Sequence, residues 1–391
     1  MNEITRQVLD VVIAGLKDQS YTGIICDQHA FYVQTVENGF SGIVYKALNS
    51  APISDQLKKH LERDFFGYVT RDAKQLDSIE TLDHILNESK INHIFLKGSR
   101  LKAIYPESFM RAMGDIDVLI PSENMNDVHH LFKKNQILLK SRSTAHDVFE
   151  LPNHIIVEVH PSLYKDFNPK YESLMKSPWS HVNLVHESRY ELKHEYELVY
   201  LLYHLAKHLD ASGIGLRSVL DIGLYAKHYE SSMNIRTLHE YVSQIDMKQF
   251  FQSMMVLCQV YFDLDLNRFI DQDFRLEDEV IDGITEYLRT SGIHGTGKKH
   301  NAFTTRFASS KNKKKNRIGV ILGIFFPDFE SMCGIYPWLK KAPLLLPVTW
   351  LLRVIRLIFV KFKSSVRKVK SMTMKEDEID QLSELFTKIG L

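Results

Sequence analysis

The sequence has few cysteines, almost no net charge and no long uncharged apolar run, and each absence excludes a class of protein. Its 391 residues include 49 basic and 48 acidic side chains, so the formal charge is +1. Cys26, Cys258 and Cys333 lie far apart without a CxxC pair, which argues against a disulfide framework or a zinc knuckle and fits a reducing compartment. With 44% apolar and 25% charged residues, the composition is typical of a globular protein and excludes a disordered or fibrous chain.

Export and membrane-spanning signals are also lacking. The first residues run into an amphipathic stretch that has neither the apolar core nor the small-residue cleavage site of a signal peptide. The apolar run closest to spanning length, 343–360, is interrupted by Arg353 and Arg356. We therefore expect a cytoplasmic protein that spans no membrane.

Hydrophobic periodicity divides the chain into helical and mixed regions. Residues 1–90 carry apolar side chains at helix spacing, which predicts an N-terminal helical region. Residues 91–185 alternate short apolar runs with turns and predict a core of strands and helices. Residues 186–295 are again helical in pattern, and 296–391 form a basic, apolar tail with helices. The expected fold class is α+β, a small mixed sheet with helices, flanked by helical regions at both ends.

Three carboxylates stand out in the predicted strands of the central region. Asp115 and Asp117 are two residues apart in the strand 115–121, so their side chains project to the same face. Two adjacent carboxylates repel unless a cation lies between them, and Mg²⁺ prefers such oxygen ligands. Glu158 lies in the middle of the apolar strand 154–160, where an acid is unfavourable unless it is paired or bound to metal.

A glycine at the end of the strand 93–98 indicates a phosphate site. Gly98 lets the backbone approach a phosphate closely, and the N–H groups that open the next helix, beginning near Ser99, can hold the anion. Four basic side chains in the same segment could neutralise a triphosphate: Lys97, Arg100, Lys102 and Arg111.

In this order, these motifs resemble the DNA polymerase β-like nucleotidyltransferase superfamily. The closer resemblance is to an uncharacterised bacterial nucleotidyltransferase family. It is carried by Leu96-Lys97-Gly98, Tyr105-Pro106, Arg111-Ala-Met113-Gly-Asp115-Ile-Asp117, Glu158-x-His160, and a later helical segment with His204, His208, Arg217 and Asp221.

The resemblance implies a polymerase-β-like core that moves an NMP from an NTP, with ATP the expected donor, to an unidentified acceptor hydroxyl with release of pyrophosphate. It implies two Mg²⁺ ions, with Mn²⁺ as the alternative, held by the catalytic carboxylates Asp115, Asp117 and Glu158. The expected nucleotide-binding residues are Lys97, Gly98, Ser99, Lys102 and Arg111. The expected acceptor-pocket residues are His160, His204, His208, Arg217 and Asp221.

Two spaced pairs in the later helical segment have simpler interpretations as well. His204 and His208 share one helix face, but no HExxH glutamate accompanies them, so a structural role, contact with the acceptor and metal binding all stay open. Arg217 and Asp221 are also four apart, which most simply predicts an ion pair along the helix.

Charge is segregated along the chain. Residues 296–374 contain 17 basic residues against Asp328 and Glu330, so the remaining chain has a net charge of −14. The basic, apolar segment 343–370 is expected to pack on the acidic remainder, to lie on an anionic membrane surface at its inner face, or to bind another polyanion. Nucleic acid is the less favoured partner, because the catalytic part is acidic.

Two other functions compete with nucleotidyl transfer. A DxD-type glycosyltransferase would use Asp115 and Asp117 to hold a metal-bound nucleotide-sugar, but it expects an α/β domain before them. A non-catalytic nucleotide-binding scaffold at a membrane surface is the other alternative, against which the intact Asp115, Asp117 and Glu158 argue.

Overall fold

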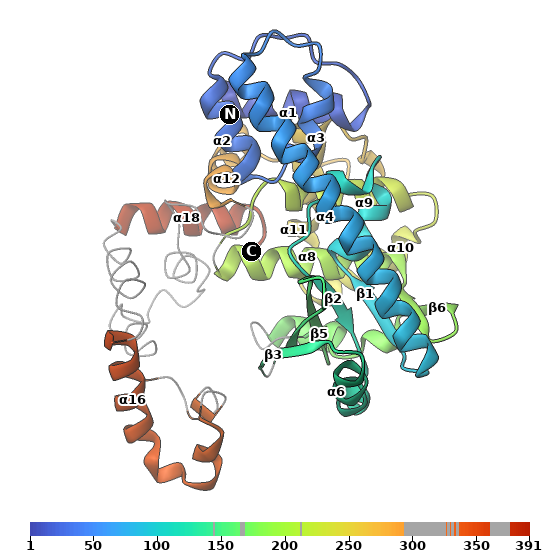
Figure 1. Ribbon diagram of the computed structural model, residues 1–391. Coiled ribbons are helices and arrows are strands. Elements are labelled where there is room, and N and C mark those ends of the chain that lie inside the picture. The colour runs from blue at the N-terminus through green and yellow to red at the C-terminus, as the bar shows by residue number, and fades with distance from the viewer. Residues whose placement is uncertain are drawn as a thin grey trace.

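A computed structural model describes residues 1–143, 145–164, 169–211, 213–292, 326, 329, 332–333, 336–359 and 376–391. Within these residues the chain forms 14 α-helices and one mixed seven-stranded sheet, so the expected α+β class with flanking helices is confirmed (Figure 1). The strands are β1 (His93–Leu96), β2 (Ile116–Leu119), β3 (Leu138–Arg142), β4 (Asp147–Glu150), β5 (Ile156–His160), β6 (Val182–His186) and β7 (Arg189–Leu192).

The sheet has the strand order β3-β4-β5-β2-β1-β7-β6. β1 pairs antiparallel with β2 and parallel with β7, and β2 pairs parallel with β5. The strands β2 and β5 are therefore neighbours at the centre of the sheet. The helices between strands are α5 (Gly98–Leu101), α6 (Met125–Lys134) and α7 (Glu172–Met175).

The central strands follow the predicted alternation. Ile116 and Val118 on β2 and Val157 and Val159 on β5 are buried in one hydrophobic cluster. Because successive side chains of a strand point to opposite faces, Asp117 and Glu158 are directed to the other face. This alternation places the acidic residues away from the apolar layer.

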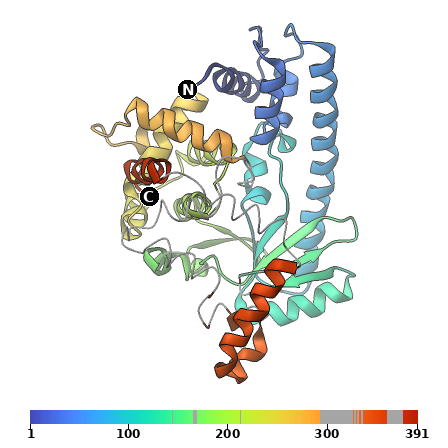
Figure 2. The ribbon, with the colours of Figure 1, turned by 90° about the vertical axis from the view of Figure 1, so that its left-hand side faces the viewer.

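Four helices precede the sheet, and the longest joins both parts of the core. They are α1 (Glu3–Leu16), α2 (Gln28–Glu37), α3 (Ser41–Ala47) and α4 (Asp55–Glu88). The side chain of Ser54 caps α4, and Figures 1 and 2 show this helix running from the N-terminal helices to the sheet. Leu61 packs in the larger hydrophobic cluster, which includes the N-terminal helices and the helices after the sheet. Leu86 packs in the second cluster, together with the apolar side chains of β2 and β5. Residues 1–114 thus contain five α-helices and the single strand β1 before Asp115, unlike the α/β domain that the glycosyltransferase alternative expects.

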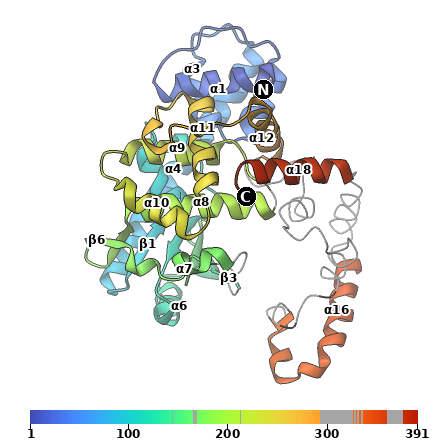
Figure 3. The same cartoon turned by 180° about the vertical axis from the view of Figure 1, so that it is seen from behind.

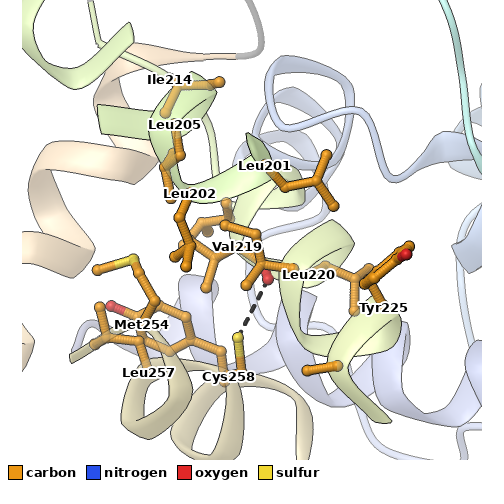
Figure 4. Close-up of a cluster of buried hydrophobic side chains, with 14 of the residues drawn as sticks. Leu201, Leu202, Leu205, Ile214, Val219, Leu220, Tyr225, Met254, Leu257 and Cys258 are labelled. Carbon is orange, nitrogen blue, oxygen red and sulfur yellow. Dashed lines mark hydrogen bonds between the residues drawn. The ribbon is translucent and has the colours of Figure 1, made fainter. Parts of the chain in front are cut away.

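Five helices follow the sheet and pack together (Figure 3). They are α8 (His194–Ala211), α9 (Arg217–Tyr229), α10 (Ile235–Gln244), α11 (Lys248–Phe262) and α12 (Asp278–Ser291). Leucines of α8 and α9 interlock with Met254 and Leu257 of α11 (Figure 4). In the same cluster, Sγ of Cys258 donates a hydrogen bond to the carbonyl oxygen of Val219 at 3.2 Å.

The sheet extends beyond residue 185, where the mixed region was expected to end. β7 pairs with β1, and β6 forms the outer strand of the same hairpin. The side chains of β6 are largely exposed, including the apolar Leu184 and Val185, so this strand is not recognised by a buried apolar face. The hairpin of β6 and β7 joins the sheet because β7 pairs with β1, which is distant in the sequence.

The described part of the basic tail contains α16 (Leu346–Phe359), and α18 (Glu376–Lys388) follows near the C-terminus. Trp350 packs beside a small cluster of Met332, Cys333 and Leu339. Residues 360–370 of the predicted membrane-binding segment 343–370 lie outside the described residues. None of the described helices is both long enough and apolar enough to cross a membrane.

Candidate functional site

The turn between β1 and α5 brings Lys97 and Gly98 to the edge of a cavity. Lys97 has a φ of 48°, in the left-handed region that residues other than glycine rarely adopt. A Cβ atom on Gly98 would lie 2.7 Å from Cγ of Met113, so a larger residue would collide with that side chain. The turn is therefore held in a strained shape that depends on glycine.

Asp117 is almost completely buried beside this turn, with 4% of its surface exposed. Its Oδ1 atom accepts hydrogen bonds from Nζ of Lys97 at 2.5 Å and from Nε2 of His160 at 2.7 Å. Burial alone would raise the pKa of Asp117, but Lys97 and His160 outweigh burial and hold that pKa far below its usual range. Burial would lower the pKa of Lys97, and Asp117 raises it instead. The two side chains therefore form a buried ion pair.

Three carboxylates line one cavity of about 390 Å³. Asp117 of β2 and Glu158 of β5 are register partners, so they stand side by side on the same face of the sheet. Asp115 lies just before β2 and reaches the same cavity. The structure thus brings together the three acids that the sequence singled out.

Two imidazoles flank Glu158, and one of them was not singled out from the sequence. Nε2 of His146 lies 3.5 Å from Oε1 of Glu158, and Nε2 of His160 lies 3.6 Å from Oε2. One ligand atom from each of the three residues lies within 4.8 Å of the others, close enough to share a metal ion after small adjustments. His146 arrives here because β4 pairs with β5, where Val148 is the partner of Glu158. A histidine just before a strand that neighbours β5 is the signal that could have identified it.

Helices α8 and α9 supply the helical side of the cavity. Their polar lining residues are His204, Lys207, His208, Arg217, Ser218 and Asp221. The rings of His204 and His208 lie 4.4 Å apart at 70°. The predicted acceptor-pocket residues of these helices therefore share a cavity with the carboxylates.

Asp221 does not form the helix-face ion pair with Arg217 that the spacing predicts among the described residues. Its Oδ1 atom accepts hydrogen bonds from Nε of Arg111 at 2.7 Å and from the hydroxyl of Tyr105 at 2.8 Å. Burial would lower the pKa of Arg111, but Asp221 raises it. The predicted ion pair between Arg217 and Asp221 is wrong because Arg111, far away in the sequence, binds the Asp221 carboxylate.

Comparison with known proteins places this cavity in a family. A family model described as an uncharacterised nucleotidyltransferase matches residues 26–263. The chain belongs to this family. No curated protein and no solved structure matches the chain.

The nucleotidyltransferase match includes every residue named above as lining the cavity. It leaves out α1 and everything from α12 to the C-terminus. The residues matched by the family model thus include the sheet, α4, α8 and α9, which are the elements that form and support the cavity. The basic tail is a feature of the chain outside the matched region.

Three predicted residues of the nucleotidyltransferase region do not line the cavity directly. Oγ of Ser99 is directed to Sδ of Met113 at 3.5 Å. Lys102 is buried in an ion pair with Asp72 of α4, and burial lowers its pKa. His160 is 3% exposed and contacts Asp117. Their positions favour support of neighbouring residues over direct contact with a ligand in the cavity.

Proposed function

We propose that this nucleotidyltransferase moves an NMP from an NTP, with ATP the expected donor, to a hydroxyl group of an acceptor and releases pyrophosphate. The observation that carries the proposal is the set of three carboxylates on one cavity wall, Asp115, Asp117 and Glu158. The strained turn at Lys97 and Gly98 beside them supports it, because such a turn can bring backbone N–H groups close to phosphate oxygens.

The donor set of the cavity fits a divalent cation. Carboxylate oxygens suit Mg²⁺ and Mn²⁺, and no described residue donates a hydrogen bond to Oδ2 of Asp117. His146 and His160 add imidazole nitrogens beside Glu158. These nitrogens make Mn²⁺ a suitable alternative to Mg²⁺ at this site. When bound, the cation would neutralise negative charge on the triphosphate.

Side chains of the chain itself would then orient the reactants and move one proton. Glu158 would accept the proton of the acceptor hydroxyl, whose oxygen forms a bond to the α-phosphorus. The bond between the α-phosphorus and the bridging oxygen breaks, and its electron pair leaves with pyrophosphate. Lys97 and the backbone at Gly98 would hold the leaving phosphates, because positioning and charge neutralisation dominate phosphoryl transfer.

The test is transfer of label from α-³²P-NTPs by the full chain, with Mg²⁺ or Mn²⁺ and a cell extract that supplies acceptors. Glu158→Gln is expected to slow transfer by about 100-fold or more, because it removes the proton acceptor. Asp117→Asn is expected to weaken nucleotide binding. Asp127→Asn changes an exposed carboxylate of α6 and serves as the matched control. Absence of transfer from every NTP by the unmodified chain contradicts the proposal.

We also propose that the tail segment around α16 binds an anionic membrane surface. Apolar side chains at helix spacing are exposed there, including Leu344 at 94% and Leu351 at 62%. Basic residues adjoin them in the sequence: Lys340, Lys341, Arg353 and Arg356. Sedimentation with phosphatidylserine vesicles tests this. Replacing Leu344 and Leu351 by Asp should abolish co-sedimentation, whereas Leu184→Asp, at an exposed site on β6, should not. Failure of the unmodified chain to bind at low salt contradicts the proposal.

A further inference from the structure

The helical side of the cavity presents the start of α9 without a side-chain cap. Leu216 occupies the N-cap position and provides no capping hydrogen bond. The first two residues of the helix, Arg217 and Ser218, both line the cavity. The N–H groups of Ser218 and Val219 already donate hydrogen bonds to the carbonyl oxygens of Gly215 and Leu216, both at 3.1 Å. The dipole of this 13-residue helix nevertheless directs its positive end to the cavity.

Arg217 itself is a buried cation that forms no ion pair within the described part of the chain. Only 7% of its surface is exposed, and its Nε atom is buried without a hydrogen-bond partner among the described residues. The carboxylate that attracts it, Asp221, accepts its hydrogen bonds from Arg111 and Tyr105. Burial and the neighbouring Arg111 together lower the pKa of Arg217 to about 10, despite attraction from Asp221. A guanidinium in this environment is unfavourable unless an anion joins it.

We propose that Arg217 and the N-terminus of α9 bind a phosphate group of a substrate. A guanidinium can donate two parallel hydrogen bonds to a phosphate, and the positive end of the helix dipole favours the same anion. Lys207 of α8 lines the cavity as well and adds positive charge. Two sources share this chemistry: the polyphosphate of the NTP donor, and a phosphate carried by the acceptor. The assignment to a substrate rests on the proposed nucleotidyl transfer, whereas phosphate binding does not.

The test measures binding to the full chain by calorimetry. The probes are inorganic pyrophosphate and α,β-methylene-ATP, each alone, and pyrophosphate again with the analogue at saturation. Arg217→Met removes the charge and keeps the length of the side chain, and Arg217→Lys keeps the charge and loses the planar fork. Arg236→Met is the matched control, because the Arg236 side chain on α10 is 89% exposed. Thermal unfolding without any anion is recorded for each variant.

Arg217→Met is expected to weaken pyrophosphate binding at least about tenfold, with Arg217→Lys between it and the unmodified chain. The control should bind as the unmodified chain does. Without anion, Arg217→Met should unfold at the same or a higher temperature, since it removes an unpaired buried charge. A purely structural arginine would instead lower the unfolding temperature when replaced.

The two sources give different patterns in the same experiment. If the site holds the donor's phosphates, Arg217→Met also weakens binding of α,β-methylene-ATP. In the unmodified chain, this analogue at saturation then prevents pyrophosphate binding. If it holds an acceptor phosphate, analogue binding is unchanged and pyrophosphate binds in its presence. Pyrophosphate affinity within twofold of the unmodified chain in Arg217→Met, or a lowered unfolding temperature without anion, overturns the proposal. Neither result depends on whether label transfer from an NTP is observed.

Discussion

The buried ion pair between Lys97 and Asp117 should make a large, measurable contribution to stability. Asp117→Asn removes the anion and leaves the Lys97 ammonium, whose side chain is 17% exposed, without its partner at 2.5 Å. Breaking a buried pair costs about 3 to 5 kcal/mol, and partial access of Lys97 to water reduces the expected loss to about 2 to 4 kcal/mol. Urea unfolding of the full chain, followed by circular dichroism, measures the change.

A double-mutant cycle separates the pair from other effects of the substitution. Lys97→Met combined with Asp117→Asn should be more stable than the sum of the single losses by about 1 to 3 kcal/mol, because no lone charge remains buried. Glu240→Gln breaks the exposed pair with Arg236 on α10 and should change the free energy of unfolding by less than about 1 kcal/mol. Additive single losses, or an unchanged stability of Asp117→Asn, would refute the reasoning.

The same pair has a defined pH dependence. Because the folded protein holds the pKa of Asp117 below its usual value of 3.8, the stabilisation is fully present above pH 3.8 and is lost as the pH falls further. The difference in stability between the unmodified chain and Asp117→Asn should therefore shrink as the pH falls below 3.8. A difference that grows on acidification would contradict this sign.

Two further predictions concern glycine packing and a buried acid. Gly98→Ala should lower the unfolding free energy by about 1 to 3 kcal/mol, since its Cβ would collide with Met113, whereas Gly67→Ala in α4 meets no atom within 4 Å and should raise it by about 0.5 to 1 kcal/mol. Urea unfolding checks both, and equal effects would exclude the packing argument. Burial raises the pKa of Glu197 to about 7 despite Arg100, so its ionisation destabilises the fold as the pH rises from 4.5 through 7. The unfolding temperature of Glu197→Gln minus that of the unmodified chain should increase from pH 4.5 to 7 and stay constant above this range. A difference that is constant throughout would show that Glu197 does not titrate there.

Local periodicity was sufficient to predict the strands that carry the acids. In 115–121 and 154–160 every second residue is apolar, and this pattern alone decides which side chains enter the core. The direction of Asp117 and Glu158 followed from it without knowledge of any partner strand. Their meeting in one cavity also required the parallel pairing of β2 with β5, which periodicity alone could not predict.

Contacts between distant segments could not be predicted in the same way. His146 reaches Glu158 through the register of β4 with β5, and Asp221 is engaged by Arg111 rather than by its helix neighbour Arg217. Neither contact leaves a spacing pattern in the sequence, because each joins residues on separate elements. Arg217 is therefore a buried cation and not half of the ion pair along the helix that its spacing predicts.

The strand order of the sheet determines when the cavity can exist during synthesis. β1 and β2 form an early antiparallel pair. The chain must then make α6, β3 and β4 before β5 can pair with β2 and bring Glu158 beside Asp117. The wall formed by α8 and α9 follows only after β7 has joined β1. Closing such long loops is slow compared with local helix formation. A chain still attached to the ribosome would therefore expose its acidic strands before it could retain a nucleotide, and the pocket would be complete only after α9 has been made.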